Sequence, residues 1–362
     1  NYKMINYIIN ATSIHRGGGL TYLFLLHSYI DKSNKLIFLD SRAKPYINDF
    51  KKIKIIFLNR GPFRNFRILF FRMKYIVKLN TYNSKAKRKL YLTELFLNGL
   101  PPLFRIHSKN KSSYIFCQNR LIFENNIKLR LLNIYNLKTQ IYLLIHKLIF
   151  NLFRNSSDIL IVQNRSMMSL LKDLKINNKL VFQEDIWGSI DKKKYSRLLR
   201  INYKDIENNS RIKNVKNLYS SNIIFFYPAY FYPHKNHFKL IKAFEKFDHL
   251  KIKPYKLLLT LSNDEFKKIF KIKNSNVVLL NKLSYKEIFN TYKYTDYLIY
   301  PSLFESYGLP LLEAKLSGID IIASDRPYVY DICKPKFVFD PNDVNSIFNI
   351  IKYSTLTNKR IN

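Results

Sequence analysis

The stretch Glu305-Ser-Tyr-Gly-Leu-Pro-Leu-Leu-Glu313 organises this chain, and it follows the strand-like apolar run Tyr297 to Ser302. Gly308 frees the backbone to turn, Pro310 suits the first helical position, where a missing N–H costs nothing, and Gly318 lies where a helix would end. A strand, a loop and a helix whose N-terminus points at the loop form an anion site. We expect the first glutamate of the stretch at the lip of that site. The second should lie about one turn inside the helix, facing the same crevice.

The length of 362 residues exceeds one comfortable hydrophobic core and predicts two domains, with 47% hydrophobic residues available for burial. We place the boundary near residue 195, where a segment rich in Lys, Asn, Arg and Ser begins and runs to residue 222. That segment contains few apolar runs, and we interpret it as a connection with room for one helix.

The formal net charge of +37, from 62 Lys and Arg against 25 Asp and Glu, would ordinarily indicate a nucleic-acid or anionic-membrane partner. Lys, Asn, Ile, Tyr and Phe are over-used together, however, and their codons are A/T-rich, so genome composition is an equal explanation. The lysines are also scattered along the chain, which argues against nucleic acid.

Cysteine usage and hydropathy predict a cytoplasmic location. Cys117 and Cys333 are the only cysteines, so the chain has neither a disulfide framework nor a Cys-based zinc pattern. The apolar run from residue 141 to 153 is too short to span a bilayer, and residues 1–30 carry no signal-peptide pattern that we can identify.

Apolar runs alternate with helical patterns along both halves, which predicts an α/β protein with two doubly wound parallel sheets. A crevice between two such domains is the expected binding place. The expected strands are residues 5–11, 35–39, 53–58, 114–118, 158–163, 223–227, 256–261, 277–280, 297–302 and 320–324. The expected helices are residues 20–30, 63–77, 139–154, 165–174, 238–247, 284–292 and 342–353.

Three consecutive glycines, Gly17, Gly18 and Gly19, follow the first expected strand in a chain that has only eight glycines. Such a loop lets backbone approach a ligand and offers N–H groups to a phosphate or a sugar hydroxyl. A glycine triplet alone is weak evidence, and a surface turn without ligand is the alternative.

The helix expected from Phe63 to Val77 alternates basic and aromatic residues. Such a helix can lie on a membrane surface. A core helix with a solvated basic face is the more common structure with this pattern, and both interpretations stay open.

Taken together, these stretches resemble the retaining, nucleotide-sugar-dependent glycosyltransferases of the GT-B fold, specifically family 4. The resemblance rests first on Glu305 and Glu313, which match that family's two glutamates with seven residues between them. It extends through residues 321–325 and 339–343, the stretch Pro233-His-Lys-Asn236, residues 160–163 and the glycine triplet. The second half of the chain resembles the family closely and the first half loosely.

This resemblance implies two Rossmann-like domains facing across a cleft. An acceptor-side domain would cover residues 1–195 and a donor domain residues 196–345. A C-terminal helix and tail would cover residues 346–362, with a return to the N-terminal domain as an open alternative.

The resemblance also implies that Glu305 lies beside the donor sugar and is the catalytic residue, and that Glu313 holds the ribose hydroxyls. Lys235 would bind the diphosphate. The backbone and side chains of Tyr307, Gly308 and Leu309, with the glycine triplet Gly17 to Gly19, would complete the donor site. The co-substrate would be a nucleoside diphosphate sugar, and no other cofactor is expected. The chain has no Asp-x-Asp pair, so we expect no divalent metal.

Two departures from the family pattern concern basic residues. The family's donor loop often carries an arginine shortly before its lysine, and residues 228–232 have none; Arg16, His234 or Arg326 could supply that charge. Many relatives also have a histidine near the acceptor. Asn119 and Arg120 occupy the plausible equivalent position, and His107 is the nearest alternative, although it could equally be an ordinary surface histidine.

The leading hypothesis is a retaining hexosyltransferase of surface polysaccharide synthesis. It would act on a saccharide or lipid-linked saccharide acceptor, as a cytoplasmic protein with peripheral association at the inner face of an anionic membrane. The alternatives are another GT-B sugar-nucleotide enzyme, such as an epimerase or a phosphorylase, and a non-enzymatic basic protein that binds nucleic acid or membrane. The dispersed charge argues against nucleic acid as a partner.

Overall fold

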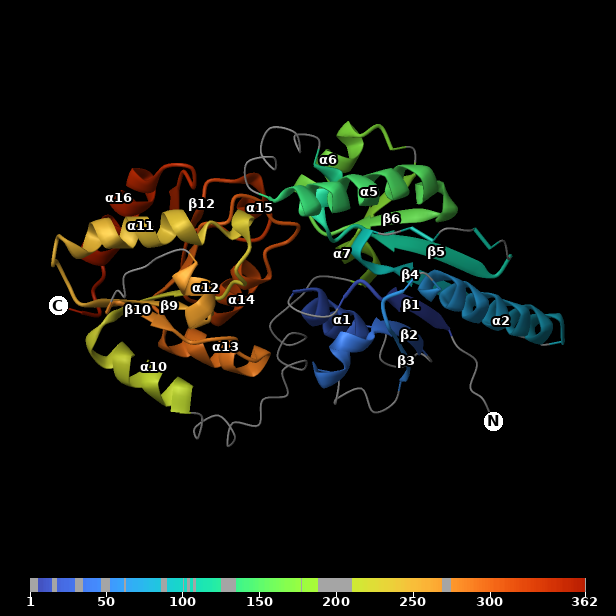
Figure 1. Cartoon of the computed structure of the whole chain (residues 1–362), viewed down its shortest axis with the longest axis horizontal. Helices are drawn as coiled ribbons and strands as arrows, with labels where there is room; N and C mark the ends of the chain where they lie inside the picture. Colours follow the sequence, from blue (N-terminus) through green and yellow to red (C-terminus); the bar gives the residue numbers. More distant parts are fainter. Residues whose placement is uncertain are drawn as a thin grey trace. The chain divides into compact units, whose positions relative to one another are not determined.

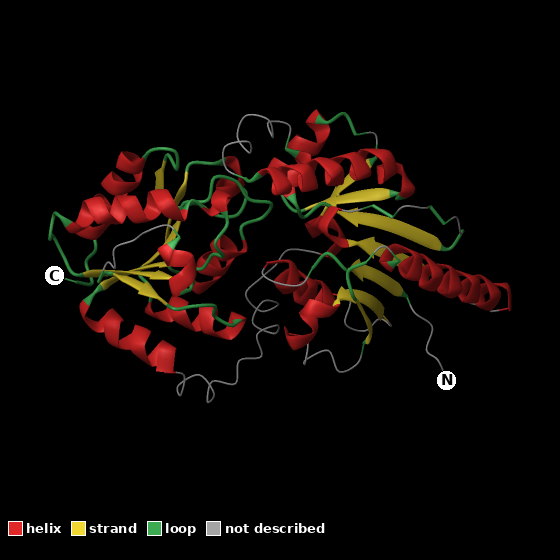
Figure 2. Ribbon diagram, in the orientation of Figure 1, coloured by secondary structure: helices red, strands yellow, loops and turns green. Residues whose placement is uncertain are grey.

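The computed structural model describes residues 6–14, 18–29, 35–46, 53–61, 63–85, 90–99, 101–102, 105–106, 109–124, 135–176, 178–187, 210–268 and 275–361. The chain forms two compact units, residues 1–190 and residues 191–362. Each unit contains one sheet with helices on both of its faces (Figures 1 and 2).

The first unit is built on a seven-stranded sheet in the order β3-β2-β1-β4-β5-β6-β7, in which every neighbouring pair is parallel. Its strands are β1 (Tyr7–Ala11), β2 (Lys35–Asp40), β3 (Lys54–Leu58), β4 (Leu92–Phe96), β5 (Lys111–Phe116), β6 (Ile159–Val162) and β7 (Lys179–Phe182). Its α-helices are α1 (Gly18–Tyr29), α2 (Arg64–Lys85), α3 (Arg120–Phe123), α5 (Leu137–Phe153), α6 (Arg165–Asp173) and α7 (Gln183–Trp187). Short 3-10 turns are η1 (Ser41–Tyr46), η2 (Leu97–Gly99) and η3 (Arg154–Ser156).

The strand order decides which helices share a face of this sheet. The connection from β1 to β2 moves toward β3, whereas those from β3 to β4, β5 to β6 and β6 to β7 move the other way. Because such crossovers are right-handed, α2, α5 and α6 cover one face and α1 covers the other. On the α1 face, Tyr22 stacks on Phe116 of β5 with ring centroids 4.5 Å apart.

The face beneath α2 contains an apolar core and a buried ion cluster. Ile68, Ile76 and Leu79 of α2 pack on residues of β1 to β4 that include Phe38. Beside them, the buried Glu94 carboxylate of β4 accepts a hydrogen bond of 2.7 Å from Arg72 of α2 and one of 2.9 Å from Lys111 of β5. Burial raises the pKa of Glu94, but the two cations outweigh it and the net pKa is lowered. The carboxylate therefore stays ionised and joins α2 to the sheet.

The second unit is built on a six-stranded parallel sheet in the order β10-β9-β8-β11-β12-β13. Its strands are β8 (Ile223–Tyr227), β9 (Tyr255–Leu259), β10 (Val277–Leu279), β11 (Tyr297–Tyr300), β12 (Asp320–Ser324) and β13 (Phe337–Phe339). Its α-helices are α10 (Ser210–Ser221), α11 (His237–Asp248), α12 (Asn263–Lys267), α13 (Tyr285–Thr291), α14 (Leu309–Ser317), α15 (Pro327–Tyr330) and α16 (Val344–Leu356). Two 3-10 turns are η4 (Pro233–Lys235) and η5 (Tyr292–Tyr294).

The direction of winding reverses in this second sheet between β8 and β11. From β8 the chain moves to β9 and β10 on one side, and from β11 it moves to β12 and β13 on the other. Loops that follow two such strands diverge and leave space at the carboxyl edge of the sheet, where ligands of doubly wound sheets bind. The loops after β8 and β11 therefore face the position where a ligand is expected.

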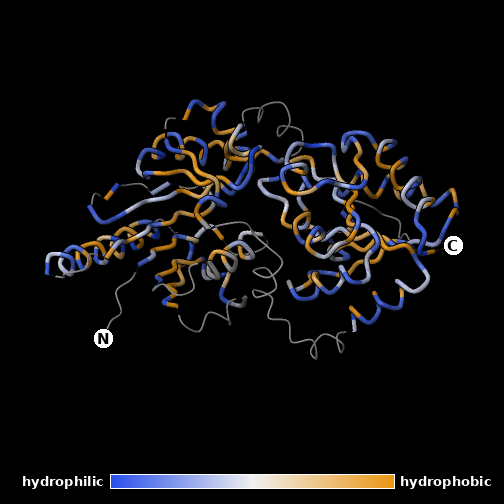
Figure 3. The backbone as a smooth tube through the Cα atoms, turned by 180° about the vertical axis from the view of Figure 1, so that it is seen from behind, coloured by the Kyte–Doolittle hydropathy of each residue, from blue (hydrophilic) through white to orange (hydrophobic). Residues whose placement is uncertain are grey.

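Burial explains why the strands were recognisable in the sequence. All residues of β8 and β11 are buried, as expected for strands covered on both faces. Figure 3 shows the hydrophobic stretches of the chain running through the sheets. Strands β8 and β12 have the predicted bounds, and a capping box of Ser284 and Glu287 starts α13.

The structure contains elements that the sequence-based expectations did not include. Strands β4, β7 and β13 were not expected, and α10 is the helix for which the 192–222 segment left room. Residues 346–362 belong to the second unit, where α16 packs on α11. At the end of the chain, Arg360 pairs with Asp296 at 2.6 Å and donates to the carbonyl of Tyr219.

Candidate functional site

The predicted donor residues Lys235 and Glu305 form an ion pair at the carboxyl edge of the second sheet. Lys235 ends η4 in the loop after β8, and Glu305 lies in the loop after β11. The Lys235 Nζ lies 2.5 Å from the Glu305 Oε1, and both side chains are largely buried. Residues seventy positions apart thus meet where the winding of the sheet reverses.

Backbone and side-chain hydrogen bonds join the two loops that carry this pair. The N–H of Leu303 donates to the carbonyl of His234 at 2.9 Å. The hydroxyl of Tyr227 donates to the carbonyl of Lys235 at 2.8 Å and lies 3.0 Å from the Ser302 Oγ. The position of the lysine relative to the glutamate is therefore set by the fold and not only by their mutual attraction.

Asn236 fixes the chain direction after Lys235. Its backbone is left-handed, with φ of 59°, which asparagine tolerates better than most residues. Its side-chain amide donates to the carbonyls of Pro301 at 3.2 Å and Pro341 at 2.8 Å, and makes no cap to α11. Asn236 thus holds the lysine loop against the loops after β11 and β13.

Glu305 is ionised in spite of its burial. Burial raises the pKa of this carboxyl, but the charge of Lys235 and hydrogen bonds from Lys235 and Ser302 outweigh it, so the net pKa is lowered. Burial, with the negative charge of Glu305 added, raises the pKa of Tyr227, Tyr300 and Tyr328 well above the ordinary value. Neutral tyrosines therefore surround one lysine–glutamate pair.

His234 does not replace the arginine that the family pattern has in this loop. Burial and the neighbouring Lys235 lower the pKa of His234 to about 4, so its ring is neutral at neutral pH. The ring lies between Tyr232 and Phe304, stacked at centroid distances of 5.8 Å and 5.3 Å. His234 therefore packs as a neutral ring between two aromatic side chains of the donor loops.

The other two candidates for the missing positive charge differ. Arg326 precedes α15, and its guanidinium already pairs with Asp340 at 3.3 Å. Arg16 lies outside the described residues. Lys235 is therefore the cation that the described loops place beside Glu305.

Helix α14 presents its N-terminus to the same edge of the sheet. Gly308 is its N-cap, with φ of 86°, and no side chain caps the first turn. Leu309 is the first helical residue and Pro310 follows it, so the proline occupies the second helical position and not the expected first. Tyr307 is buried just before the cap. Pro310 has no N–H and the Leu311 N–H donates to the Gly308 carbonyl at 2.9 Å, so the Leu309 N–H and the dipole of the helix are what this turn can offer to an anionic oxygen.

Glu313 lies on the buried side of α14, one turn after its start. Only 4% of Glu313 is exposed, and its Oε2 accepts a hydrogen bond of 3.0 Å from the Tyr292 hydroxyl. A carboxylate at such a position needs polar partners. Tyr292 provides one of them and holds the side chain against η5.

The predicted residues of the first unit do not form a comparable cluster within the described part of that unit. Gly17 and His107 lie outside the described residues. Gly18 and Gly19 open α1, and a Cβ at Gly19 would lie 3.2 Å from the Ile14 Cγ2, so close packing by itself accounts for that glycine. Ligand binding by this triplet remains a prediction.

Asn119 and Arg120 have structural partners at the carboxyl end of β5. The Asn119 side chain caps α3 by accepting from the N–H of Leu121 at 3.2 Å. Arg120 pairs with Glu124 at 2.9 Å. These contacts explain both residues without a ligand, and their acceptor role stays a prediction.

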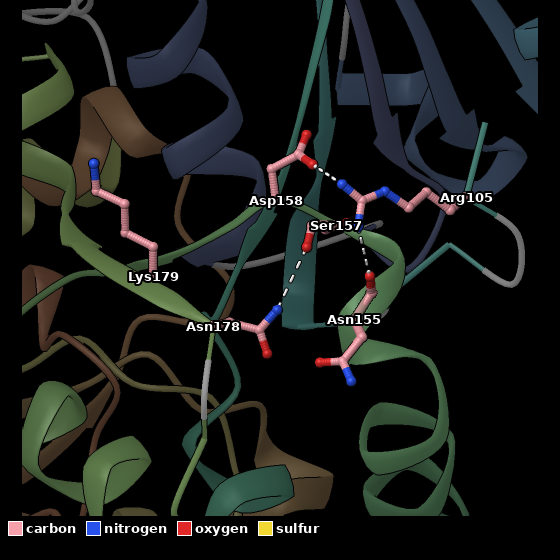
Figure 4. Close-up of a pocket in the computed structure, with 6 residues that line it drawn as sticks. All are labelled: Arg105, Asn155, Ser157, Asp158, Asn178 and Lys179. Carbon is pink, nitrogen blue, oxygen red and sulfur yellow. Dashed lines mark hydrogen bonds and ion pairs between the residues drawn. The ribbon is translucent and has the colours of Figure 1, made fainter. Parts of the chain in front are cut away.

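A polar pocket of about 340 Å³ lies at the opposite edge of the first sheet (Figure 4). Ser157 and Asp158 precede β6, and Asn178 precedes β7, so the pocket is at the amino ends of the strands. In it, Arg105 pairs with Asp158 at 2.6 Å, and Asn178 donates to the carbonyl of Ser157 at 3.4 Å. The pocket does not include the predicted acceptor residues.

Among the residues that the structure describes, no group of three or more His, Cys, Asp or Glu side chains comes together as metal ligands would. The expectation of metal-free chemistry therefore remains a prediction about the reaction.

The sequence did not reveal the tyrosines and the serine that surround Glu305. Tyr227, Tyr300 and Ser302 lie within expected strands, so the sequence pattern indicates only that they belong to the core. Only the pairing of β8 with β11 brings them to one place.

Comparisons with known proteins agree with this architecture. Residues 208–359 match the model of the family described as Glycosyl transferases group 1. No curated protein sequence matches the chain significantly. This match lies within the second unit.

Several solved structures share the fold. Anabaena HepE, in complex with UDP and glucose, is 14% identical with a TM-score of 0.62, over 98% of this chain and 91% of that one. Sucrose-phosphate synthase from Thermosynechococcus elongatus is 14% identical with a TM-score of 0.63, over 97% and 90% of the two chains. A glycosyltransferase from Rickettsia africae is 16% identical with a TM-score of 0.61, over 99% and 90%. The fold is thus the GT-B fold of two Rossmann-like domains, and with the family match the chain is a transferase enzyme.

Proposed function

We propose that this glycosyltransferase moves a hexose-like unit from a nucleoside diphosphate sugar to a saccharide or lipid-linked saccharide, with retention of anomeric configuration. The observation that carries the proposal is the Lys235–Glu305 pair at 2.5 Å, beside the uncapped N-terminus of α14. A cation and a helix N-terminus suit a diphosphate, and a largely buried carboxylate next to them suits the sugar attached to it.

The leaving group decides what the site must stabilise. When the glycosidic bond breaks, the electron pair passes to the phosphate oxygen of the departing nucleoside diphosphate. Lys235 and the first turn of α14 would stabilise that negative charge as it develops. Because these groups are already held in place by the fold, no divalent cation is required for the purpose, and we propose metal-free transfer.

Glu305 would contact the donor sugar as an ionised carboxylate. Its lowered pKa makes it an acceptor of hydrogen bonds from sugar hydroxyls and a partner for positive charge that develops on the sugar ring. Retention would follow from attack on the face from which the leaving group departs. In that mechanism the leaving phosphate oxygen takes the proton of the acceptor hydroxyl as the new glycosidic bond forms.

Glu313 would hold the ribose of the nucleotide. Its carboxylate is buried on α14, and Tyr292 orients it through a hydrogen bond of 3.0 Å. Two adjacent hydroxyls of a ribose can donate to the two oxygens of one carboxylate, and this pairing would fix the orientation of the ribose.

We propose that the first unit binds the acceptor near Asn119 and Arg120, and that a lipid-linked acceptor brings the protein to the inner face of a membrane in surface polysaccharide synthesis. Another GT-B reaction, such as epimerisation or phosphorolysis, is the second candidate, because the same donor-binding residues would serve it.

A donor screen followed by product analysis tests the proposal. Anabaena HepE is described in complex with UDP and glucose, so UDP-glucose is the first donor to try, followed by GDP- and other UDP-sugars. The expected result is one preferred donor, and a product whose anomeric proton couplings match the configuration of that donor. An inverted product would contradict retention, and release of an epimerised nucleotide sugar would favour the second candidate.

Chelation tests the metal-free part of the proposal. We expect EDTA to leave the transfer rate unchanged, because Lys235 and α14 supply the positive electrostatic potential. Loss of activity with EDTA and its recovery with magnesium would overturn this part while leaving the donor assignment intact.

A further inference from the structure

Helix α2 exposes a row of large apolar side chains. Phe63, directly before the helix, is 73% exposed, and Phe66, Phe70, Met73 and Val77 are 66%, 64%, 52% and 61% exposed. Their spacing of three and four residues places them on one side of the helix. The opposite side, with Ile68 and Ile76, is buried on the sheet. A surface helix ordinarily presents polar residues outward, so this row is unusual.

Helix α5 exposes a second row of the same kind. The exposed fractions of Leu137, Ile141, Ile145, Leu148 and Leu152 lie between 47% and 70%. Its buried side carries Leu143 and Phe150. Two helices of one unit therefore each present an apolar row to the outside.

The two rows lie on the same side of the first unit. Right-handed crossovers place α2 and α5 on the same face of the sheet, and both helices start at its carboxyl edge (Figure 1). Their N-terminal parts are neighbours, because the charges of Arg60, shortly before α2, and of Arg64, its first residue, act on Tyr142 of α5. We call this surface the α2–α5 face, defined by the outward residues of the two rows.

The charge on the α2–α5 face has one sign. Helix α2 contains exposed Arg67, Lys74 and Lys78, and α5 contains exposed Lys138. Neither helix contains an aspartate or a glutamate. An apolar surface flanked by these basic residues calls for a partner that is apolar and anionic at once.

We propose that the α2–α5 face docks on the surface of an anionic lipid bilayer, with its aromatic and aliphatic rows in the headgroup region and its basic residues against the phosphates. In the part of the chain that the structure describes, no helix is long and apolar enough to cross a bilayer. The helices therefore lie on the membrane, as amphipathic surface helices do. A second copy of this chain fits less well, because two faces of the same positive sign would repel each other.

This docking surface extends the proposed function, because it would bring the acceptor-side unit to lipid-linked sugars. Vesicle binding and sugar transfer to a soluble saccharide are separate measurements. A chain that does not bind vesicles can still transfer sugar to a soluble saccharide, and a chain that transfers no sugar can still bind vesicles. The two proposals can therefore fail separately.

Vesicle sedimentation of the full chain tests the proposal. We expect binding to phosphatidylcholine vesicles that contain about one third phosphatidylglycerol, and much weaker binding to pure phosphatidylcholine. The double variant Phe66→Ser, Phe70→Ser should lower the partition coefficient by about tenfold or more, because two exposed phenyl rings no longer enter the headgroup region. Lys74→Gln with Lys78→Gln should lower binding to the anionic vesicles alone, and added salt should do the same.

The matched control lies in the second unit. Phe238 and Tyr353 are 49% and 55% exposed, and Phe238→Ser with Tyr353→Ser should leave vesicle binding unchanged. Circular dichroism would verify that each variant is folded. The proposal is overturned if the wild-type chain ignores anionic vesicles, or if the Phe66, Phe70 variant binds them as the wild type does. It is also overturned if sedimentation equilibrium shows a dimer that the same variant dissociates while neither protein binds vesicles.

Discussion

At the scale of single residues, the proposed chemistry depends on how the fold pairs Lys235 with Glu305. Both side chains are largely buried, so each would carry an uncompensated charge without the other. A diphosphate bound by Lys235 would compete with the carboxylate for the same ammonium group. The fold thus places this charged pair at the carboxyl edge of the sheet, where a ligand is expected to bind.

Replacing Glu305 separates catalysis from nucleotide binding. Glu305→Gln keeps the shape of the side chain and removes its charge, so we expect the transfer rate to fall by about a hundredfold or more. Nucleoside diphosphate affinity should be retained, because Lys235 stays in place. Calorimetric binding and a product assay measure the two effects, with the exposed Glu184→Gln as the control. An unchanged transfer rate would remove Glu305 from the catalytic role.

Replacing Glu313 tests the ribose assignment. Glu313→Ala should raise the dissociation constant of the nucleotide by about tenfold or more, because the ribose hydroxyls lose a charged acceptor. Tyr292→Phe removes the hydrogen bond to Glu313 and keeps the carboxylate, so it should weaken binding much less. If both variants lose the same nucleotide affinity and the same unfolding free energy, Glu313 stabilises the fold and does not bind the ribose.

At the scale of elements, α14 is framed by two glycines whose surroundings differ. Gly308 before the helix has φ of 86°, and an added Cβ would lie 3.1 Å from the Leu311 Cδ1. Gly318 after the helix has φ of 75°, and an added Cβ would meet no atom within 4 Å. Both positions require a conformation that other residues rarely adopt, but only the first is also crowded.

These two glycines give a matched pair of substitutions. Gly318→Ala should cost about 1 kcal/mol of unfolding free energy, from backbone strain alone. Gly308→Ala should cost more and should also weaken nucleotide binding, because Leu311 and the first turn of α14 must shift. Urea unfolding and a nucleotide titration measure both effects. Equal stability losses with unchanged nucleotide affinity would show that the start of α14 is not part of the donor site.

The elements that the sequence did not predict are those whose stability comes from distant partners. Strand β4 has Glu94 near its middle, which is unusual in a buried parallel strand until Arg72 and Lys111 are brought beside it. Strand β7 is a four-residue edge strand with little buried surface. Most helices and long apolar strands were predicted correctly, because their periodicity and caps are local properties.

At the scale of the whole molecule, the half-buried His234 and the buried His237 make stability depend on pH. Burial, with a smaller effect of Lys235, lowers the pKa of His234 to about 4 and that of His237 to about 3. The ordinary value is 6.5, so between pH 6.5 and those values the unfolded chain binds more protons than the folded one. Stability is therefore full above pH 6.5 and falls as the pH decreases.

Urea unfolding at pH 7, 6 and 5 tests this dependence. Each histidine should remove up to about 1.4 kcal/mol of unfolding free energy per pH unit in that window. Glu305, whose pKa is lowered from 4.5, adds its own loss only at lower pH. His237→Phe, which keeps a ring against Tyr227, should flatten the dependence, whereas the exposed His249→Phe should not. A midpoint that stays constant from pH 7 to pH 5 would contradict the burial of neutral rings.

The sequence by itself determined the two α/β halves, the bounds of most elements, and the likeness of Glu305, Lys235 and Glu313 to a donor site. These features depend on local patterns, namely apolar runs, caps and the spacing of residues around one turn. The tertiary structure decided the contact of Lys235 with Glu305, the neutral state of His234 and the outward direction of the α2 and α5 rows. Those properties depend on which strands are neighbours and which face each helix covers, and residues far apart in the chain determine both.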